Sequence, residues 1–378
     1  MSDLSLVLLG AGESSRFKLK TKKQWLRVEN WPIWQFVAKR FENFYKFKKI
    51  VITASDYELK LMQNMAGFTF VKGGKTRQES LINALEHIDS DYVLVSDIAR
   101  VCINKEFIEK ITEYIGKADC IAPYINVSDT VVYKNETIDR EEIKLIQTPQ
   151  LSNTKILKEA LSKNIIFTDE SSAIKWYGGK VEYIEGDKTF KKLTYIEDLE
   201  DIKCLKPPAK DIFTGNGFDI HPFVKNKPLM LGGVEITKEY GFKGHSDGDV
   251  LIHSIIDALL GAAGYGDIGE FFPDNEEKYK NIDSKILLKE IVEIIEKTGF
   301  EIVNIDATII TQKPKISPFK NEIKNSLSKI LNLDKSKINI KATTTEKMGF
   351  IGREEGTAVL SSANLKYFDW TSVLGGKK

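Results

Sequence analysis

The amino-acid sequence predicts an α/β protein built from two domains. Its 378 residues favour two domains over a single core. Segments with strand character alternate with segments of helical spacing, which is typical of α/β folds. The pattern restarts after KPPAKD at 206–211, where two prolines among small and charged residues forbid a helix and suit a linker. We therefore expect a first domain at residues 1–207 and a second at residues 211–378.

The first domain is predicted to contain a doubly wound, mostly parallel sheet. Its strand segments are short apolar runs bounded by turn or acidic residues, and its helical segments repeat their apolar residues every three to four positions. We expect strands at 4–12, 48–55, 91–99, 120–127 and 180–186, and helices at 33–44, 77–88 and 197–205. Alternation of this kind favours parallel strands joined by crossover helices.

The second domain is also predicted to mix strands and helices. We expect strands at 213–223, 301–312, 338–350 (entering a loop) and 358–368, and helices at 249–264, 284–299 and 317–331. The helix at 249–264 is largely apolar, so it should be buried or lie at a subunit contact.

Composition excludes several classes of protein. An apolar fraction of 42% and a charged fraction of 29% are those of a globular protein in water. The net charge of +1 gives no bulk attraction to nucleic acid or membranes. No apolar run approaches a membrane helix, and Asp3 stands where a signal peptide needs positive charge. Cys102, Cys120 and Cys204 lack a CxxC pair, so we expect unpaired cysteines and a reducing cytoplasm.

The first candidate site is a glycine turn followed by cations. Gly10-Ala11-Gly12 follows a strand, but Ser15 stands where the dinucleotide fingerprint needs its third glycine. Exposed N–H groups in such a loop hold phosphate oxygens, and Arg16 and Lys23 beyond it can neutralise charge on a phosphorus under attack. Asp97 ends a strand at the edge where open α/β sheets bind ligands. A simple tight connection is the alternative explanation of the glycine turn.

The second candidate site is a cluster of histidines and carboxylates. Three of the four histidines share one short stretch: His221, His245 and His253. Asp219 and His221 are two residues apart on a strand, so both side chains leave the same face. With His253 they supply three ligands and leave one position open, as in a catalytic zinc site. Asp249 or Asp257 would orient His253 from the same helix. A single histidine on an apolar helix would more simply be a packed core residue.

Eight motifs of the first half, in order, resemble those of methylerythritol-phosphate cytidylyltransferases. They are GAGESSRFKLKTKKQWL (10–26), GGKTRQES (73–80), VSDIAR (95–100), SDT (128–130), IDR (138–140), QTPQ (147–150), TDESSA (168–173) and FKKLTYIEDL (190–199). The resemblance covers most of residues 1–205. It implies a Rossmann-like nucleotidyltransferase domain that transfers CMP from CTP to 2-C-methyl-D-erythritol 4-phosphate and releases pyrophosphate.

The same resemblance implies roles for single residues. The catalytic set would be Arg16, Lys23, Arg140 and Lys192. The substrate-binding set would be Gly10, Ala11, Gly12, Ser80, Asp97, Arg100, Asp129 and Thr130. Asp97 would hold the Mg²⁺ that accompanies CTP, and Thr130 and Arg140 would come from a dimer partner. The chain departs from the family pattern at Ser14, Lys22 and Val101, which replace a glycine and two prolines; we expect a tighter loop and less rigid turns there.

Motifs across residues 212–368 resemble 2-C-methyl-D-erythritol 2,4-cyclodiphosphate synthases. They are GFDIHPF, LGGVEI, GHSDGDVLIHSIIDALLGAAGYGDIGEFFPD and KATTTEKMGFIGREEG. The resemblance implies an intramolecular reaction. The 2-phosphate of 4-diphosphocytidyl-2-C-methyl-D-erythritol 2-phosphate attacks the β-phosphorus of its own diphosphate, and CMP leaves.

In this family, Asp219, His221 and His253 would hold Zn²⁺ or Mn²⁺, and a second ion, Mg²⁺ or Mn²⁺, would lie near Glu346. His245 and Thr344 would be catalytic. The remaining substrate contacts would be Ser246, Asp267, Ile268, Gly269, Phe272, Pro273, Asp274, Asn275, Glu276, Thr343, Thr345, Glu346, Phe350 and Arg353. The cytidine would lie near TQKPKIS at 311–317.

The resemblances also predict assembly and partners. A trimeric second domain combined with a dimeric first domain gives a hexamer of D₃ symmetry. The chain has no GxxxxGK[ST] loop, so a separate kinase, which could dock on this protein, would have to add the 2-phosphate between the two reactions. Two alternatives stay open: a first half acting on another sugar or alditol phosphate, and a second half that is only a metal-binding trimerisation module.

Overall fold

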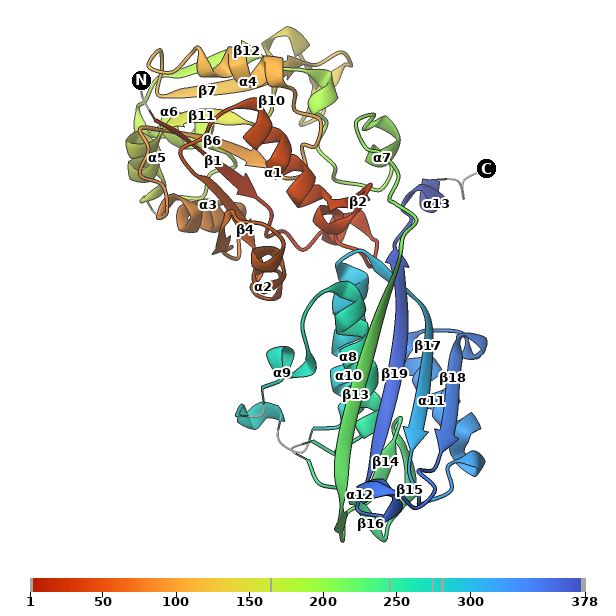
Figure 1. Ribbon diagram of the computed structural model, residues 1–378. Coiled ribbons are helices and arrows are strands. Elements are labelled where there is room, and N and C mark those ends of the chain that lie inside the picture. The colour runs from red at the N-terminus through yellow and green to blue at the C-terminus, as the bar shows by residue number, and fades with distance from the viewer. Residues whose placement is uncertain (1–2, 164, 245, 274, 280–281, 375–378) are drawn as a thin grey trace. The chain divides into compact units, whose positions relative to one another are not determined.

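The computed structural model describes residues 3–163, 165–244, 246–273, 275–279 and 282–374 (Figure 1). It forms two compact units. One runs to Pro207 and takes in the chain again from Trp370, and the other spans Pro208–Asp369. We expected the second domain to run to residue 378, whereas Trp370 packs with the first unit and donates a hydrogen bond to Arg27 O at 2.8 Å. His245 and Asp274 lie outside the described residues.

The first unit is built on a mixed sheet of eight strands. Their order is β10-β7-β11-β6-β1-β4-β5, and β12 pairs with β7 on a separate branch. The strands are β1 (Leu4–Leu9), β4 (Ile50–Ala54), β5 (Thr69–Lys72), β6 (Tyr92–Asp97), β7 (Cys120–Asn126), β10 (Lys144–Ile146), β11 (Gln150–Asn153) and β12 (Val181–Glu185). β5, β4, β1 and β6 are parallel, and β11 enters between β6 and β7 in the opposite direction. The predicted mostly parallel sheet is confirmed.

Helices cover this sheet on both faces. They are α1 (Ile33–Phe44), α2 (Asp56–Met65), α3 (Arg77–Leu85), α4 (Lys105–Thr112), α5 (Thr154–Leu161), α6 (Glu170–Tyr177) and α7 (Asp198–Asp201). Val7 packs in a core formed with α3, α5 and α6, and its neighbours Leu6 and Leu8 are equally buried on the opposite face. Such two-sided burial explains why β1 is a continuous apolar run.

The predicted helix at 33–44 is confirmed, whereas the helix predicted at 197–205 is wrong beyond Asp201. Lys203 N and Leu205 N bond to carbonyls two and three residues back, so the chain turns there instead of continuing as a helix. The helices α2, α4, α5 and α6 were not predicted.

The second unit has a five-stranded sheet of order β16-β13-β19-β17-β18. Its strands are β13 (Ile212–Lys225), β16 (Tyr240–Phe242), β17 (Phe300–Ile310), β18 (Ile338–Thr343) and β19 (Gly356–Tyr367), beside a hairpin of β14 (Leu229–Leu231) and β15 (Val234–Thr237). Only β17 and β18 pair in parallel within the described sheet. The helices are α8 (Val250–Ala263), α9 (Ile268–Phe271), α10 (Ser284–Lys297), α11 (Lys320–Leu331) and α12 (Gly349–Gly352).

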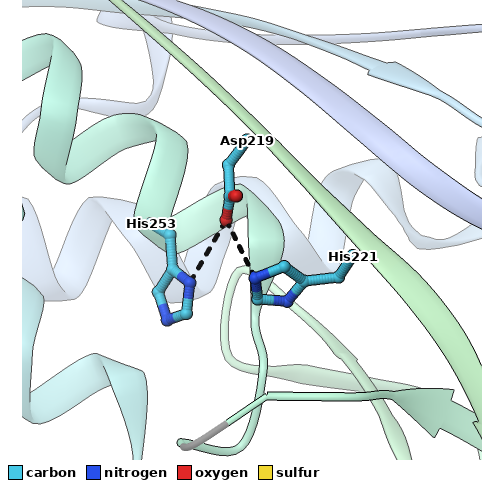
Figure 2. Close-up of side chains that lie close together, drawn as sticks. All are labelled: Asp219, His221 and His253. Carbon is cyan, nitrogen blue, oxygen red and sulfur yellow. Dashed lines mark hydrogen bonds and ion pairs between the residues drawn. The ribbon is translucent and has the colours of Figure 1, made fainter. Parts of the chain in front are cut away.

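The apolar helix α8 lies very close to β13. A Cβ atom on Gly217 would stand 1.9 Å from the carbonyl oxygen of Ser254, and one on Gly215 would stand 2.1 Å from that of Ala258. Only glycine permits this approach of helix and strand backbones. The prediction that this helix is buried is confirmed, and its contact with β13 brings His253 Nδ1 to 3.2 Å from Asp219 Oδ2 (Figure 2).

The expectation of three unpaired cysteines is corrected by the structure. Cys102 and Cys204 are joined by a disulfide whose Cα atoms are 5.7 Å apart, although 102 residues separate them in sequence. The fold brings the turn after β6 next to the segment after α7, which no local motif indicated. Cys120 is buried and free. Among the helices that the structure describes, none has both the length and the apolar character needed to cross a bilayer.

Candidate active sites

The first site is a cavity of about 800 Å³ at the carboxyl ends of the parallel strands in the first unit. Loops after β1, β4, β5 and β6 form it, as expected for an open α/β sheet. Its lining includes the predicted residues Gly10, Ala11, Gly12, Arg16, Lys23, Ser80, Asp97 and Lys192. The structure therefore brings together eight residues that the sequence spreads over more than 180 positions.

Lys23 is the half-buried cation of this cavity. Its Nζ donates a hydrogen bond to the carbonyl oxygen of Leu193 at 3.0 Å. Burial and the positive charge of Lys192 lower the pKa of Lys23 to about 8. The pKa of Lys23 therefore lies close to neutral pH, and the approach of an anion would favour its charged form.

Asp97 is held between two cations at the end of β6. Lys192 Nζ lies 2.8 Å from Oδ2, and Arg77 Nε lies 3.3 Å from Oδ1. Burial alone would raise the pKa of Asp97, but Arg77 and Lys192 outweigh it and hold the pKa well below its usual range. Asp97 is thus ionised and offers the hard carboxylate oxygens that Mg²⁺ prefers.

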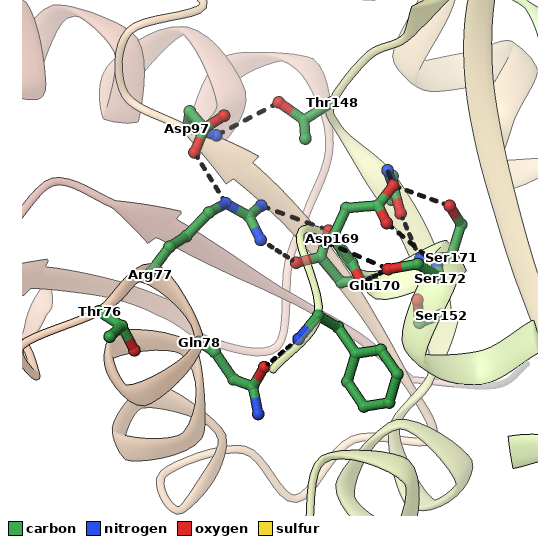
Figure 3. A network of polar contacts seen from close by, with 12 residues as sticks. Thr76, Arg77, Gln78, Asp97, Thr148, Ser152, Asp169, Glu170, Ser171 and Ser172 are labelled. Atoms are coloured by element: carbon green, nitrogen blue, oxygen red, sulfur yellow. Dashed lines mark hydrogen bonds and ion pairs between the residues drawn. The ribbon is translucent and has the colours of Figure 1, made fainter. Parts of the chain in front are cut away.

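Arg77 links Asp97 to a second buried carboxylate, and sequence reasoning missed it. Its Nη1 donates to Glu170 Oε1 at 2.7 Å while its Nε faces Asp97 (Figure 3). Glu170 has no exposed surface, and burial raises its pKa despite Arg77. The GGKTRQES motif contains Arg77 three residues before Ser80, so that motif was the available signal.

Ser80 lines this site, whereas the predicted contact Arg100 does not. Ser80 Oγ accepts from Gly74 N at 3.0 Å and donates to Thr76 O at 2.9 Å, which fixes the turn into α3. Arg100 does not line the cavity: its Nε donates to Thr148 Oγ1 at 3.0 Å. Burial lowers the pKa of Arg100.

Three predicted residues of the first half lie away from this cavity. Asp129, Thr130 and Arg140 flank an exposed hairpin of β8 (Val131–Tyr133) and β9 (Glu136–Ile138). Arg140 Nη1 donates to Ser128 O at 2.9 Å, so its contacts stay within the hairpin region.

The three departures from the family pattern fit the structure. Ser14 adopts a left-handed φ of 57°, the conformation for which glycine is normally used. Lys22 is buried and its Nζ lies 3.0 Å from a Glu13 carboxylate oxygen, which fixes a position where the family has proline. Val101 is only 1% exposed, so it fills the core after the Asp97 turn.

The second site is the cluster of Asp219, His221 and His253. Asp219 Oδ2 lies 3.2 Å from His221 Nε2 and 3.2 Å from His253 Nδ1 (Figure 2). One ligand atom from each residue lies within 4.8 Å of the others. Two imidazoles and one carboxylate suit a divalent ion of the zinc type with a position left for substrate.

Partners behind the two imidazoles set which nitrogens face the centre. His221 Nδ1 lies 2.9 Å from the carbonyl oxygen of Gly248, so it carries the proton and Nε2 is free to bind. His253 Nε2 lies 3.0 Å from Ser284 Oγ, which in turn donates to Asp247 at 2.5 Å. Burial lowers the pKa of His221. Burial alone would raise the pKa of Asp219, but the polar contact with His253, the two histidines and the N–H of Ile220 together outweigh it and lower that pKa.

The expected orienting role of Asp249 and Asp257 is wrong. Asp249 caps α8 and accepts hydrogen bonds from Gly232 N at 2.9 Å and Gly233 N at 2.7 Å. As the N-cap it also accepts from Ile252 N at 3.1 Å, so both of its oxygens are engaged at the start of α8. Asp257 accepts from Ile268 N at 2.8 Å. Ser284 and Asp247 take the role instead, and Ser284 lies on a different helix, 31 residues after His253.

A cavity of about 320 Å³ opens beside these three ligands. Of the predicted substrate contacts, it is lined by Ser246, Ile268, Gly269 and Phe272. Asp267 caps α9 through Glu270 N at 3.2 Å, next to the lining. Pro273, Asn275 and Glu276 follow on the same segment without lining the cavity.

The remaining predicted contacts form a separate group after β18. The group comprises Thr343, Thr344, Thr345, Glu346, Phe350 and Arg353, none of which lines the cavity beside His253. Thr344 Oγ1 donates to Glu346 Oε1 at 2.9 Å. Gln312 Oε1 accepts from Lys347 N at 3.4 Å, so the 311–317 segment lies beside this group.

Comparisons with known proteins identify a family for each half of the chain. The 2-C-methyl-D-erythritol 4-phosphate cytidylyltransferase model matches residues 4–204, and the YgbB family model matches residues 212–366. The bifunctional enzyme IspD/IspF of Aliarcobacter butzleri is 57% identical over 371 residues, which cover 98% of this chain and 99% of the relative. That of Nitratiruptor is 55% identical over 373 residues, covering 99% and 100%.

A solved structure resembles the whole chain. The bifunctional IspDF from Campylobacter jejuni is 52% identical and matches with a TM-score of 0.88, covering 98% of this chain and 100% of that chain. These findings confirm the predicted fold class and the predicted pair of activities, a cytidylyltransferase and a cyclodiphosphate synthase of isoprenoid biosynthesis. The chain belongs to the family of bifunctional IspD/IspF enzymes.

Proposed function

We propose that the cavity beside the glycine loop is where CTP reacts with 2-C-methyl-D-erythritol 4-phosphate, with Arg16 and Lys23 as catalytic cations. The observation that carries this assignment is the convergence of Arg16, Lys23 and Lys192 on one cavity at the carboxyl ends of parallel strands. In-line attack places developing negative charge on the oxygens of the α-phosphate. Fixed cations in a partly buried site stabilise that charge more than water does.

Substrate contacts in this cavity follow from its lining. Gly10, Ala11, Gly12 and Ser80 would hold the cytidine and its phosphates, and Asp97 would hold Mg²⁺, which supplies charge neutralisation at the triphosphate. Lys192 would position the methylerythritol phosphate, with Arg100 supporting the same wall. Asp129, Thr130 and Arg140 would act from the hairpin of a dimer partner, since they lie away from the cavity of their own chain.

A Lys23→Ala variant tests this half of the proposal. It should lose cytidylyl transfer while keeping the release of CMP at the second site. Several phosphorylated acceptors assayed with CTP and with UTP separate the proposed reaction from the alternative one. A different sugar or alditol phosphate that outperforms methylerythritol phosphate would favour the alternative.

For the second half, we propose that the cavity beside His253 cyclises 4-diphosphocytidyl-2-C-methyl-D-erythritol 2-phosphate. Asp219, His221 and His253 would hold Zn²⁺ or Mn²⁺, which supplies Lewis-acid stabilisation and brings two like-charged phosphates together. Ser246, Asp267, Ile268 and Gly269 would bind the sugar alcohol. Phe272, Pro273, Asp274, Asn275 and Glu276 would complete the wall. His245 would stabilise the transition state.

The rest of this site would come from a neighbouring copy. Thr344 would act catalytically and Glu346 would hold a second Mg²⁺ or Mn²⁺, with the cytidine near 311–317. Thr343, Thr345, Phe350 and Arg353 would add substrate contacts. These residues do not line the His253 cavity of their own chain, which supports a site built between subunits.

Exposed apolar surface supports this assembly. Phe218 and Leu360 stand opposite each other in the β13–β19 register and are 57% and 47% exposed, with Ile220 beside them at 38%. Such a face suits contact with further copies, and we propose a trimer there. Val132 and Tyr133 on the hairpin are exposed and suit a dimer of first domains. This dimer and the trimer of second domains combine into a D₃ hexamer. Light scattering should find the hexamer, and a stable monomer would contradict it.

The wider setting is also proposed. Residues 1–207 would carry the first activity and residues 211–378 the second, with a separate kinase acting between them and docking on the assembly. A cytoplasmic location stays a prediction, and the Cys102–Cys204 disulfide is a bond that reducing compartments normally disfavour. Purified protein that made cyclic diphosphate from CTP, ATP and methylerythritol phosphate unaided would exclude the need for the kinase.

A His253→Ala variant tests catalysis against the scaffold alternative. A variant that stays folded and oligomeric but loses metal and CMP release supports catalysis at this site. Unchanged CMP release would support a metal-binding trimerisation module.

A further inference from the structure

We propose that Glu58 is a positioning residue for cytidylyl transfer: its buried carboxylate ties the glycine loop to the turn that carries Lys23. The proposal rests on the catalytic role proposed for Lys23. Glu58 lies in the first turn of α2, lines no part of the cavity and has no exposed surface. A buried carboxylate must be matched by donors or cations, so its partners show what it holds in place.

One oxygen of Glu58 fastens the two residues after Lys23. Oε1 accepts from Trp25 Nε1 at 2.7 Å and from Gln24 Nε2 at 3.0 Å. Both donors are buried, and hydrogen bonds to a charged acceptor are stronger than neutral ones. The short helix η2 (Lys23–Trp25) is therefore anchored by its second and third side chains.

The other oxygen faces the residue before Lys23. Oε2 lies 3.5 Å from Lys22 Nζ and accepts from Ser55 N at 3.2 Å and from the Ser55 hydroxyl. Lys22 Nζ also lies 5.0 Å from the centre of the Tyr57 ring. Residues 22, 24 and 25 thus all contact Glu58, and the turn they form presents Lys23 and Gln24 to the cavity.

Gln24 extends the network to the glycine loop. Its Nε2 also donates to Gly12 O at 3.1 Å, and its Oε1 accepts from Ser14 Oγ at 3.0 Å. Ser14 Oγ in turn accepts from Lys23 N at 3.3 Å. Ser14 thus gives the loop a side-chain link that a glycine at this position lacks. One carboxylate therefore sets the distance between the phosphate loop and the catalytic lysine.

This distance matters because catalysis by fixed charge depends on sub-ångström placement. A misplacement of about 1 Å can reduce the rate by about 10²-fold. Replacing Glu58 by glutamine keeps the size of the side chain. Its NH₂ group, however, would face donors in either position: Trp25 and Gln24 on one side, or Lys22 and Ser55 on the other. We expect Glu58→Gln to lower kcat for cytidylyl transfer by about 10- to 100-fold, with a smaller change in KM for CTP.

The pH profile supplies a readout that a purely structural role would not move. Burial lowers the pKa of Lys23, so a loosened Lys23 that gains solvent should keep its charge to higher pH. The alkaline limb of kcat/KM, which reports the free enzyme, should therefore shift to higher pH in Glu58→Gln. Asn153→Ala is the matched control. Asn153 is the N-cap of α5, where its Oδ1 accepts from Ile156 N at 3.1 Å, and it does not line the cavity. Its loss should therefore affect stability without moving Lys23.

Two further variants complete the test. Trp25→Phe removes one donor to Glu58 and should lower kcat several-fold, which keeps the proposal testable should Glu58→Gln not fold. In a double-mutant cycle of Glu58→Gln and Ser14→Gly, the fold-decrease in kcat of the double variant should be smaller than the product of the two single decreases. Both residues act through one network, so their effects are not independent.

CMP release at the second site serves as the internal measure of intact protein. A folded Glu58→Gln protein with kcat within twofold of the unmodified enzyme would overturn the inference. The inference would also be overturned if Asn153→Ala lowered kcat as much as Glu58→Gln does. A double variant whose decrease in kcat equals the product of the two single decreases would overturn it as well. A failure of the role proposed for Lys23 would look different, because Lys23→Ala itself would then retain cytidylyl transfer.

Discussion

The contact between α8 and β13 should control metal binding. Replacing Gly217 by alanine puts a Cβ atom 1.9 Å from the carbonyl oxygen of Ser254, a distance below the 3.0 Å that real Cβ atoms keep. The helix must then retreat from the strand by about 1 Å. His253 lies next to Ser254 and moves with it, whereas Asp219 and His221 stay on the strand.

The retreat is large on the scale of metal coordination. Ligand distances in a metal site hold within about 0.2 Å, so a shift of about 1 Å takes His253 out of reach. We expect the affinity of the full-length protein for Zn²⁺ to fall by at least about 10- to 100-fold, the loss seen when only an orienting partner is removed. Overpacking should also lower the free energy of unfolding by about 1–3 kcal/mol.

The assay is competition with a chelator for Zn²⁺, followed by CMP release. Gly261→Ala is the matched control on the same helix, because its Cβ would meet Asn216 O at an ordinary 3.8 Å. That variant should bind Zn²⁺ normally and gain about 0.5–1 kcal/mol of stability from the loss of a helical glycine. Unchanged Zn²⁺ affinity in Gly217→Ala, or an equal loss in Gly261→Ala, would refute the reasoning.

Three other predictions follow from single contacts. Because the pKa of Lys23 in the free protein is lowered to about 8 and its charged form is the active one, kcat/KM for cytidylyl transfer should fall as pH rises through about 8, and Lys23→Arg should move that fall to higher pH. Ser284→Ala removes the hydroxyl 3.0 Å from His253 Nε2, so chelator competition should show Zn²⁺ affinity lowered by about 10- to 100-fold with the fold intact. Trp370 is 5% exposed and its Nε1 donates to Arg27 O at 2.8 Å. Calorimetry of Trp370→Ala should therefore show the free energy of unfolding of the first unit lowered by about 3–5 kcal/mol. A Trp370→Phe variant as stable as the unmodified protein would argue against a contribution from the hydrogen bond.

Local pattern predicted those features whose partners are close in sequence. Asp219 and His221 share a strand face because they are two residues apart, and the helix at 33–44 shows its apolar spacing within its own length. The cavity lined by the glycine loop was also predicted, since Arg16, Lys23 and Asp97 favoured a phosphate site over a simple tight connection. In each case the physical rule operates within one element or at one edge of the sheet.

Features that depend on packing between distant elements were not predicted. Ser284 reaches His253 only because α10 packs on α8, and Asp249 seemed as good a candidate until its N-cap position turned it away. Glu58 lies in the first turn of α2 and Arg77 begins α3, and the partners of both, Lys22 and Glu170, are distant in sequence. The disulfide and the return of Trp370 to the first unit join segments more than 100 residues apart.

The two sites solve the same electrostatic problem in different ways. The chain as a whole carries a charge of only +1, so attraction for phosphate must be local. In the first site, cations of the protein outnumber the carboxylates, and Arg77 and Lys192 already neutralise Asp97 before any substrate arrives. Lys23 keeps a lowered pKa as long as no anion balances it, so its full charge develops when phosphate enters. The second site presents two imidazoles and one carboxylate to its centre, so the charge that offsets the substrate phosphates has to come from a bound ion. Removal of the metal should therefore abolish CMP release at the second site, because no positive charge is then left at its ligands. The lysines and arginines of the first site carry their charge without a metal.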